Sequence, residues 1–245
     1  MFIPIGTRER QPRHRFPIVT LLLVALSVAV FAYEVALWLE DPVALERFIG
    51  GYGMVPREVV SGVDRPPWGP DPVALTVLTS MFLHGGFLHI VGNMLFLLAF
   101  GDNVEDRLGA LPFLLFYLAA GVAAAAAHIA VDPRSAVPTV GASGAVAGVL
   151  GAYLVLHPTG SVHTLVLLGP FVTVTRVWAV LFIGVWVVFQ LLSGLASLGV
   201  PTAQTDGVAY WAHIGGFAAG VVAALAVRVT GWPPAPRRGP RARVR

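Results

Sequence analysis

The sequence predicts an all-α integral membrane protein: a bundle of six transmembrane helices with a long membrane-associated loop between the first two. Of the 245 residues, 56% are hydrophobic and only 12% are charged, whereas soluble domains carry about 25% charged residues. Six apolar stretches also meet or approach the roughly 20 residues that a helix needs to cross a bilayer. Composition and segment length therefore point to the same fold class.

The predicted spans are residues 17–39, 80–100, 111–130, 142–157, 177–198 and 208–229. The first follows an arginine-rich start, as a signal peptide would, but its apolar run of about 23 residues exceeds the 7 to 15 of a signal sequence. We expect it to stay in the protein as an anchor. The expected organisation is a basic tail (1–16), a six-helix domain (17–229) and a Pro/Arg-rich tail (230–245).

The charges predict the orientation of the bundle. All 16 basic residues of the Lys+Arg count are arginines, and many lie in the two tails, so they indicate no nucleic-acid-binding face. Because short positively charged segments stay in the cytoplasm, both termini are expected there and the 40–79 loop outside. Abundant Arg, Ala, Gly and Pro without Lys favour a prokaryotic cell membrane. The absence of cysteine excludes disulfides and thiol catalysis.

Four polar residues are expected at one depth, near the outer face. Spans 80–100, 142–157 and 208–229 run in the same direction, and close to their starts lie His89 and Asn93, Ser143, and His213 respectively. Polar groups inside a membrane are costly and suggest function by default. We therefore expect these three spans to share a cavity.

Nucleophilic acyl transfer is the chemistry that this set of residues favours. A serine hydroxyl needs an adjacent base, which a neutral imidazole supplies, so Ser143 and His213 form the expected pair. Backbone N–H groups at a helix start, with His89 and Asn93 four residues apart on one helix face, could stabilise an oxyanion. Between Asp132 and Asp206 there is no Asp or Glu, so a dyad is expected, with the imidazole oriented by an aromatic ring.

Glycines explain how serine and histidine could meet. Small residues at four-residue spacing let membrane helices approach closely, which predicts that span 142–157 packs directly on span 208–229. Gly141 and Gly144 also leave the backbone around Ser143 open to a substrate carbonyl. The glycines of these two faces are Gly141, Gly144, Gly148, Gly151, Gly216 and Gly220.

Three motifs together resemble the rhomboid family of intramembrane serine proteases. They are "HGGFLHIVGN" on the second span, "GASGAVAG" on the fourth and "AHIGGFAAG" on the sixth. The resemblance implies cleavage of transmembrane segments of membrane proteins, without cofactor or metal, near the outer membrane face. It further implies Ser143 as nucleophile, His213 as base, an oxyanion hole of His89, Asn93 and the Ser143 N–H, and a structural role for His84.

One departure concerns the position four residues after the serine, which is aromatic in many relatives but Ala147 here. Tyr210, Trp211 or a ring from the fifth span is expected to orient His213 instead. Gln190 on that span either lines the substrate entrance or forms a hydrogen bond within the bundle.

Two alternatives stay open. The chain could be a catalytically silent rhomboid-like protein that binds transmembrane clients, although silent relatives usually lose one or both dyad residues. It could also hold zinc through His84, His89 and His213, although the sequence has no H-E-x-x-H motif and no carboxylate on the last three spans.

Overall fold

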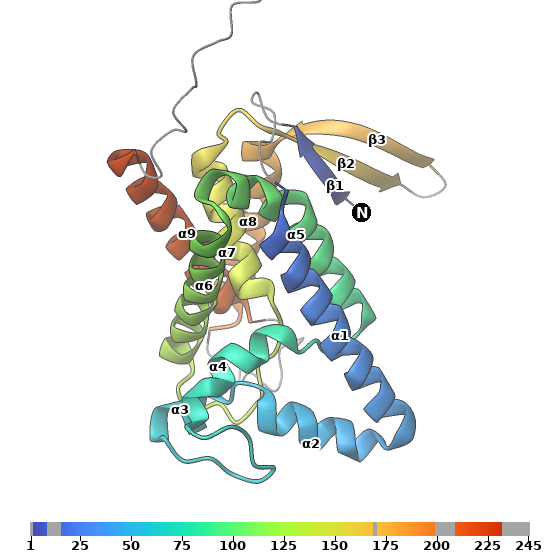
Figure 1. The fold of residues 1–245 in the computed structure, drawn as a ribbon, viewed down its shortest axis with the longest axis vertical. Helices are drawn as coiled ribbons and strands as arrows, with labels where there is room; N and C mark the ends of the chain where they lie inside the picture. The colour runs from blue at the N-terminus through green and yellow to red at the C-terminus, as the bar shows by residue number, and fades with distance from the viewer. Residues whose placement is uncertain (1, 9–15, 169–170, 199–208, 232–245) are drawn as a thin grey trace, which may run out of the picture.

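The structure is a computed structural model, and it describes residues 2–8, 16–168, 171–198 and 209–231. It is a bundle of long helices with short helices across one end and a small sheet at the other (Figure 1). The elements are β1 (Phe2–Arg8), α1 (Ile18–Glu40), α2 (Pro42–Tyr52), α3 (Pro56–Ser61), η1 (Val73–Leu75), α4 (Thr76–Thr79), η2 (Ser80–Phe82), α5 (Phe87–Leu108), α6 (Ala110–Val131), α7 (Ser143–Leu156), β2 (Ser161–Leu168), β3 (Phe171–Trp178), α8 (Ala179–Ala196) and α9 (Tyr210–Thr230).

The predicted helical membrane bundle is confirmed. Within the described residues, α1, α5, α6, α8 and α9 are each long and apolar enough to cross a membrane. The fourth predicted span corresponds to α7, which is apolar but has only 14 residues. At 1.5 Å per residue it is about 21 Å long, shorter than the ~30 Å hydrocarbon core. The protein is therefore an integral membrane protein whose α7 does not need to reach both surfaces.

The second predicted span, residues 80–100, is displaced along the chain. Its helix, α5, begins at Phe87 and ends at Leu108. Residues 76–82 instead form the separate short helices α4 and η2. The chain changes direction at Gly86, whose φ of +150° favours glycine because it has no Cβ. Hydropathy alone could not separate this apolar turn from the helix that follows it.

Two buried carboxylates join α1 and α5 at opposite ends. Glu105 of α5 accepts hydrogen bonds from the N–H groups of Val19 (2.9 Å) and Thr20 (2.8 Å) and from the Thr20 hydroxyl (2.7 Å). These donors lie in the first turn of α1, where N–H groups have no partner within the helix. At the other end, Glu34 of α1 accepts from the His84 N–H at 3.1 and 3.2 Å. Each helix thus supplies a carboxylate to the backbone at or before the start of the other.

The glycines of α7 and α9 place the two helices in direct backbone contact, as predicted. A Cβ on Gly216 would collide with the Gly144 carbonyl oxygen, and one on Gly220 with the Gly148 carbonyl oxygen. On α7 itself, a Cβ at Gly148 would lie 3.2 Å from the Gly216 carbonyl oxygen. Close packing of this kind is typical of small residues at four-residue spacing.

The long loop after α1 is folded over one end of the bundle. Helix α2 runs across the end of α1 with α4 next to it, and α3 lies on the other side of this end, near α6 (Figure 1). Pro42 occupies the first turn of α2, and the Asp41 side chain accepts a hydrogen bond from the Val43 N–H at 2.9 Å. This pairing of an N-cap acid with a following proline is a common helix start.

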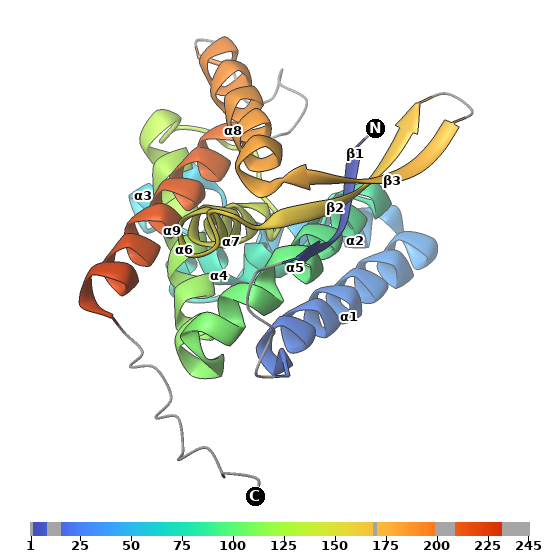
Figure 2. The same ribbon diagram turned by 90° about the horizontal axis from the view of Figure 1, so that it is seen from above.

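A three-stranded antiparallel sheet, ordered β1-β2-β3, lies at the opposite end. This sheet was not predicted, because its strands are too short and apolar to be distinguished from the neighbouring spans. The β2–β3 hairpin projects to one side of the helices (Figure 2). Strand β1 falls within the expected tail 1–16 and is tied to α5 by a hydrogen bond from the Thr7 hydroxyl to the Ala99 carbonyl (3.1 Å). Arg8 is the last residue of β1, and the other arginines of the two expected tails lie outside the described residues.

The α7–α9 contact predicts the effect of replacing Gly216. Gly216→Val should force the two helices apart and lower the free energy of unfolding by about 1–3 kcal/mol or more, because overpacking strains a close interface. The measurement is thermal unfolding in detergent. Gly184→Val is the matched control, since a Cβ at Gly184 on α8 meets nothing within 4 Å. Equal losses in both variants would contradict the prediction.

Candidate active site

Ser143 and His213 are in direct contact. His213 Nε2 lies 2.8 Å from Ser143 Oγ, although 70 residues separate them in the sequence. Ser143 is the first residue of α7, and His213 lies in the first turn of α9. The expected pairing of these two side chains is therefore present, and the glycine contact between the two helices explains how it forms.

The segment before Ser143 is held by the loop after α1. Met54 and Thr139 exchange two backbone hydrogen bonds, of 3.0 and 2.8 Å, and the Gly141 N–H donates to the Ser80 carbonyl at 2.9 Å. The positions on either side of Val140 are thus fixed by two different parts of that loop. This leads the chain into α7 in a defined direction, which places the serine.

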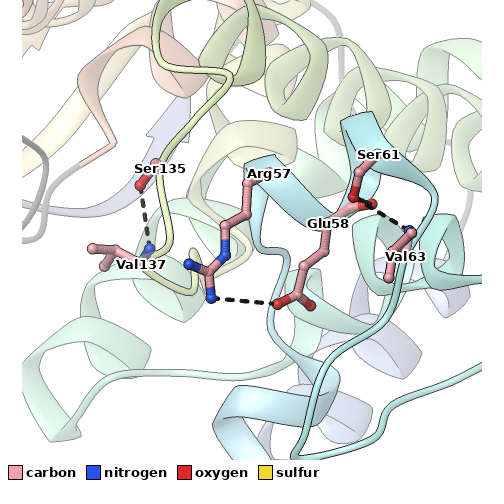
Figure 3. A network of polar contacts seen from close by, with 6 residues as sticks. All are labelled: Arg57, Glu58, Ser61, Val63, Ser135 and Val137. Atoms are coloured by element: carbon pink, nitrogen blue, oxygen red, sulfur yellow. Dashed lines mark hydrogen bonds and ion pairs between the residues drawn. The ribbon is translucent and has the colours of Figure 1, made fainter.

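A second set of contacts supports the same segment farther out (Figure 3). The Arg57 N–H donates to the Ser135 carbonyl (3.1 Å), and the Ser135 hydroxyl accepts from the Val137 N–H (3.2 Å). The Arg57 guanidinium also lies 3.8 Å from Glu58. Because Arg57 is partly exposed, this ion pair contributes little stability, and the backbone hydrogen bonds hold the two loops together.

Helix α8 supplies both neighbours that orient the His213 ring. Gln190 Oε1 lies 2.7 Å from His213 Nδ1, and the Trp186 ring centre lies 6.0 Å from that of His213, with the planes tilted by 36°. Ala147, four residues after the serine, is fully buried and offers no ring. The orienting ring thus comes from the fifth span, one of the expected sources. Of the two roles expected for Gln190, the structure shows the hydrogen bond within the bundle. The only sequence signal for that role is that Gln190 is an isolated amide in an apolar helix.

The His89 ring lies against Gly141, two residues before the serine. The Gly85 N–H donates to His89 Nδ1 at 3.2 Å, so in a neutral ring the proton resides on Nε2. A Cβ at Gly141 would lie 2.7 Å from that Nε2 and 3.6 Å from Ser143 Oγ. Gly141 has φ +125°, and both this conformation and the close approach of His89 require glycine there.

Asn93 lies one turn farther along α5 and is buried. Its Nδ2 donates to the His89 carbonyl at 3.1 Å, which uses one of the two protons of the amide. Both His89 and Asn93 line the same cavity as Ser143. The structure therefore brings together all four of the polar residues expected at one depth.

His84 lies before α5 and outside the cavity lining. Its Nδ1 is 3.1 Å from the Phe82 carbonyl, and its ring meets that of His89 edge-on with centres 5.3 Å apart. Burial and, next, the His89 ring lower the pKa of His84 from 6.5 to about 4, although the Phe82 hydrogen bond opposes this. His84 is thus neutral near pH 7, and its Nδ1 proton is donated to the loop.

The cavity beside Ser143 has a volume of about 650 Å³. Its lining is mostly apolar, an arrangement typical of binding and active sites, and its polar residues are Ser80, His89, Asn93, Thr139, Ser143 and His213. Among the residues that the structure describes, no three His, Asp or Glu side chains are grouped as ligands of one metal ion. The imidazole of His213 instead faces Ser143 and Gln190.

A family model described as the Rhomboid domain matches residues 72–229. The chain belongs to the rhomboid family. The matched segment of this rhomboid protein runs from η1 to α9 and includes both Ser143 and His213.

Several curated rhomboid proteins are similar to it. Rhomboid protein 1, mitochondrial, of Saccharomyces cerevisiae is 30% identical over 204 residues, which cover 82% of this chain and 50% of the relative. Putative rhomboid protease YdcA of Bacillus subtilis is 29% identical over 144 residues (57% and 62%). Rhomboid protease GluP of the same species is 44% identical over 78 residues (32% and 15%). The chain spans less than two thirds of the length of each of these relatives.

The Glu34 contact predicts how firmly the turn before His89 is held. Glu34→Leu should lower the free energy of unfolding by about 1–3 kcal/mol, because it leaves the buried His84 N–H without its acceptor. Glu34→Gln keeps an acceptor oxygen and should lose less, as thermal unfolding will show. The control is Tyr33→Leu at the neighbouring position, which is 52% exposed. A Glu34→Leu variant as stable as Glu34→Gln would show that the hydrogen bond contributes nothing.

Proposed function

We propose that this rhomboid protein is an intramembrane serine endopeptidase that uses Ser143 as nucleophile and His213 as general base. The observation that supports the proposal most directly is the 2.8 Å contact between Ser143 Oγ and His213 Nε2 at a cavity between apolar helices. A serine becomes an effective nucleophile when a neutral imidazole can take its proton.

In the first step, Ser143 Oγ attacks the carbonyl carbon of the scissile peptide bond while its proton passes to His213 Nε2. The carbonyl oxygen becomes an oxyanion. We assign its stabilisation to three donors: the Nε2–H of His89, the second amide proton of Asn93, and the backbone N–H of Ser143. No side chain caps the start of α7, so its first N–H groups and the positive end of the helix dipole are available to an anion.

In the second step, the tetrahedral intermediate collapses and the C–N bond breaks. His213 gives the proton on its Nε2 to the departing amine, which leaves an acyl group on Ser143 Oγ. Water then enters, His213 takes its proton, and the hydroxide attacks the ester carbonyl. The second collapse releases the carboxylic acid and returns the proton to Ser143. These side chains supply every proton transfer, and no cofactor or metal enters the scheme.

The surroundings of the site support a transmembrane substrate. The site lies within a bundle of membrane-crossing helices, and α7 is too short for Ser143 to lie at the membrane surface if its other end does. A substrate segment would approach from the bilayer, in keeping with the mostly apolar cavity. With both termini in the cytoplasm, as the arginine distribution favours, the site would face the outer side, in a prokaryotic cell membrane.

Replacing Ser143 tests the nucleophile. Ser143→Ala should abolish cleavage of a single-pass membrane protein in liposomes and labelling by a fluorophosphonate, because the attacking oxygen is gone, while thermal unfolding stays as in the wild type. Serine labelling and product mass are the measurements. Cleavage by Ser143→Ala at the wild-type rate would refute the proposal. Wild-type protein that binds the client but never labels would favour the silent client-binding alternative.

His89 tests the oxyanion hole separately from the nucleophile. His89→Ala should lower kcat by about 10²- to 10³-fold, the usual effect of removing one oxyanion donor, with a smaller change in KM. The control is Val91→Ala, two residues along the same helix, which is 50% exposed and does not line the cavity. A folded His89→Ala protein with wild-type kcat would exclude His89 from the oxyanion hole.

A further inference from the structure

We propose that Gln190 of α8 is a positioning residue that selects the tautomer of His213 required for catalysis. The effect of this tautomer on catalysis rests on the proposed function, but the tautomer itself can be measured in a protein that shows no activity. It assigns to a neutral amide the position that a carboxylate occupies in a Ser-His-Asp triad.

The geometry places the amide and the hydroxyl on opposite nitrogens of one ring. Gln190 Oε1 lies 2.7 Å from Nδ1, and Ser143 Oγ lies 2.8 Å from Nε2. In the part of the chain that the structure describes, no carboxylate bonds to His213. The ring is therefore held between a group that can only accept, the amide oxygen, and a group that must donate for catalysis to begin.

The proton count follows from this arrangement. A neutral imidazole carries one N–H, and an amide oxygen accepts but cannot donate. The proton of His213 is thus drawn to Nδ1, which leaves the Nε2 lone pair facing Ser143. The opposite tautomer would leave Nδ1 and Oε1 as two acceptors in contact, and would point an N–H at the serine oxygen, so it could not take the serine proton.

Trp186 and Gln190 act from one face of α8. They are four residues apart and therefore lie one above the other on the helix. The tryptophan ring limits tilting of the imidazole, while the amide fixes which nitrogen points away from the serine. Ala147 on α7 is too small to take part. Helix α8 thus supplies both the aromatic contact that Ala147 of α7 cannot make and the hydrogen bond to His213.

The membrane setting favours an amide over a carboxylate here. An ionised Asp or Glu at this depth would be costly to bury, whereas an amide bears no charge and still offers an acceptor oxygen. A neutral acceptor stabilises the imidazolium less than a charged one would, because charge-assisted hydrogen bonds are stronger. The site then depends more on its oxyanion donors for transition-state stabilisation.

The test compares Gln190→Met, which removes the acceptor at similar length, with Gln190→Glu, which keeps an acceptor oxygen. Nitrogen-15 spectra of histidine-labelled protein, with the His213 signals assigned by their loss in His213→Ala, report the tautomer. We expect a protonated Nδ1 and bare Nε2 in the wild type and in Gln190→Glu, and a mixture of tautomers in Gln190→Met. Val188→Met, at a 53% exposed position of the same helix, is the matched control.

Kinetics provide the second measurement. Gln190→Met should lower kcat for a single-pass substrate by about 10- to 100-fold, the effect of losing one buried hydrogen bond, with KM unchanged. Gln190→Glu should recover part of the loss. A wild-type His213 with its proton on Nε2, or a folded Gln190→Met protein with wild-type spectra, would overturn the inference. Correct spectra in a wild-type protein that never cleaves would instead overturn the proposed function and leave the tautomer assignment standing.

Discussion

The direct backbone contact between α7 and α9 is the constraint on which the rest of the structure depends. Ser143 and His213 come from helices that are far apart in the sequence, and their side chains are short. They reach each other because Gly148, Gly151, Gly216 and Gly220 have no side chains where the two backbones meet. The remaining elements are arranged around this pair. Hydrogen bonds from the loop after α1 position the segment before Ser143, and Gln190 of α8 orients the His213 ring.

In the part of the chain that the structure describes, neutral groups and not charged ones bond to the side chains of Ser143 and His213. The buried carboxylates Glu34 and Glu105 each bond to backbone N–H groups near a helix start, where the partial positive charge of the peptide groups offsets their own. The imidazoles of the site instead meet an amide oxygen, a hydroxyl and a backbone N–H. Such neutral contacts let the site hold several polar groups in an apolar surrounding without an uncompensated charge.

The membrane helices and the contact between Ser143 and His213 could be predicted from the sequence. Apolar runs indicate the helices, and glycines at regular spacing indicate which helix faces pack closely together. The sequence was insufficient where the deciding partner is distant. The start of α5 depends on Gly86 and on Glu34 of another helix, and the sheet depends on pairing between residues 2–8 and 161–168. Gln190 could not be assigned either, because its partner is fixed by how α8 rotates against α9.

The hydrogen bonds of Glu34 and Glu105 fix how far α5 is shifted along α1, and they therefore fix the position of His89 along the bundle. Thr20 and Glu34 are 14 residues apart in α1, about 21 Å along its axis, and both are bonded to the α5 side at once. If α1 slid along α5 in either direction, the hydrogen bonds of both carboxylates would lengthen. The two helices can therefore pack in only one register. Adding one residue between these positions would turn Glu34 by about 100° and shift it by about 1.5 Å. The length of α1 thus determines where the His89 ring of another helix lies against the segment that leads to Ser143.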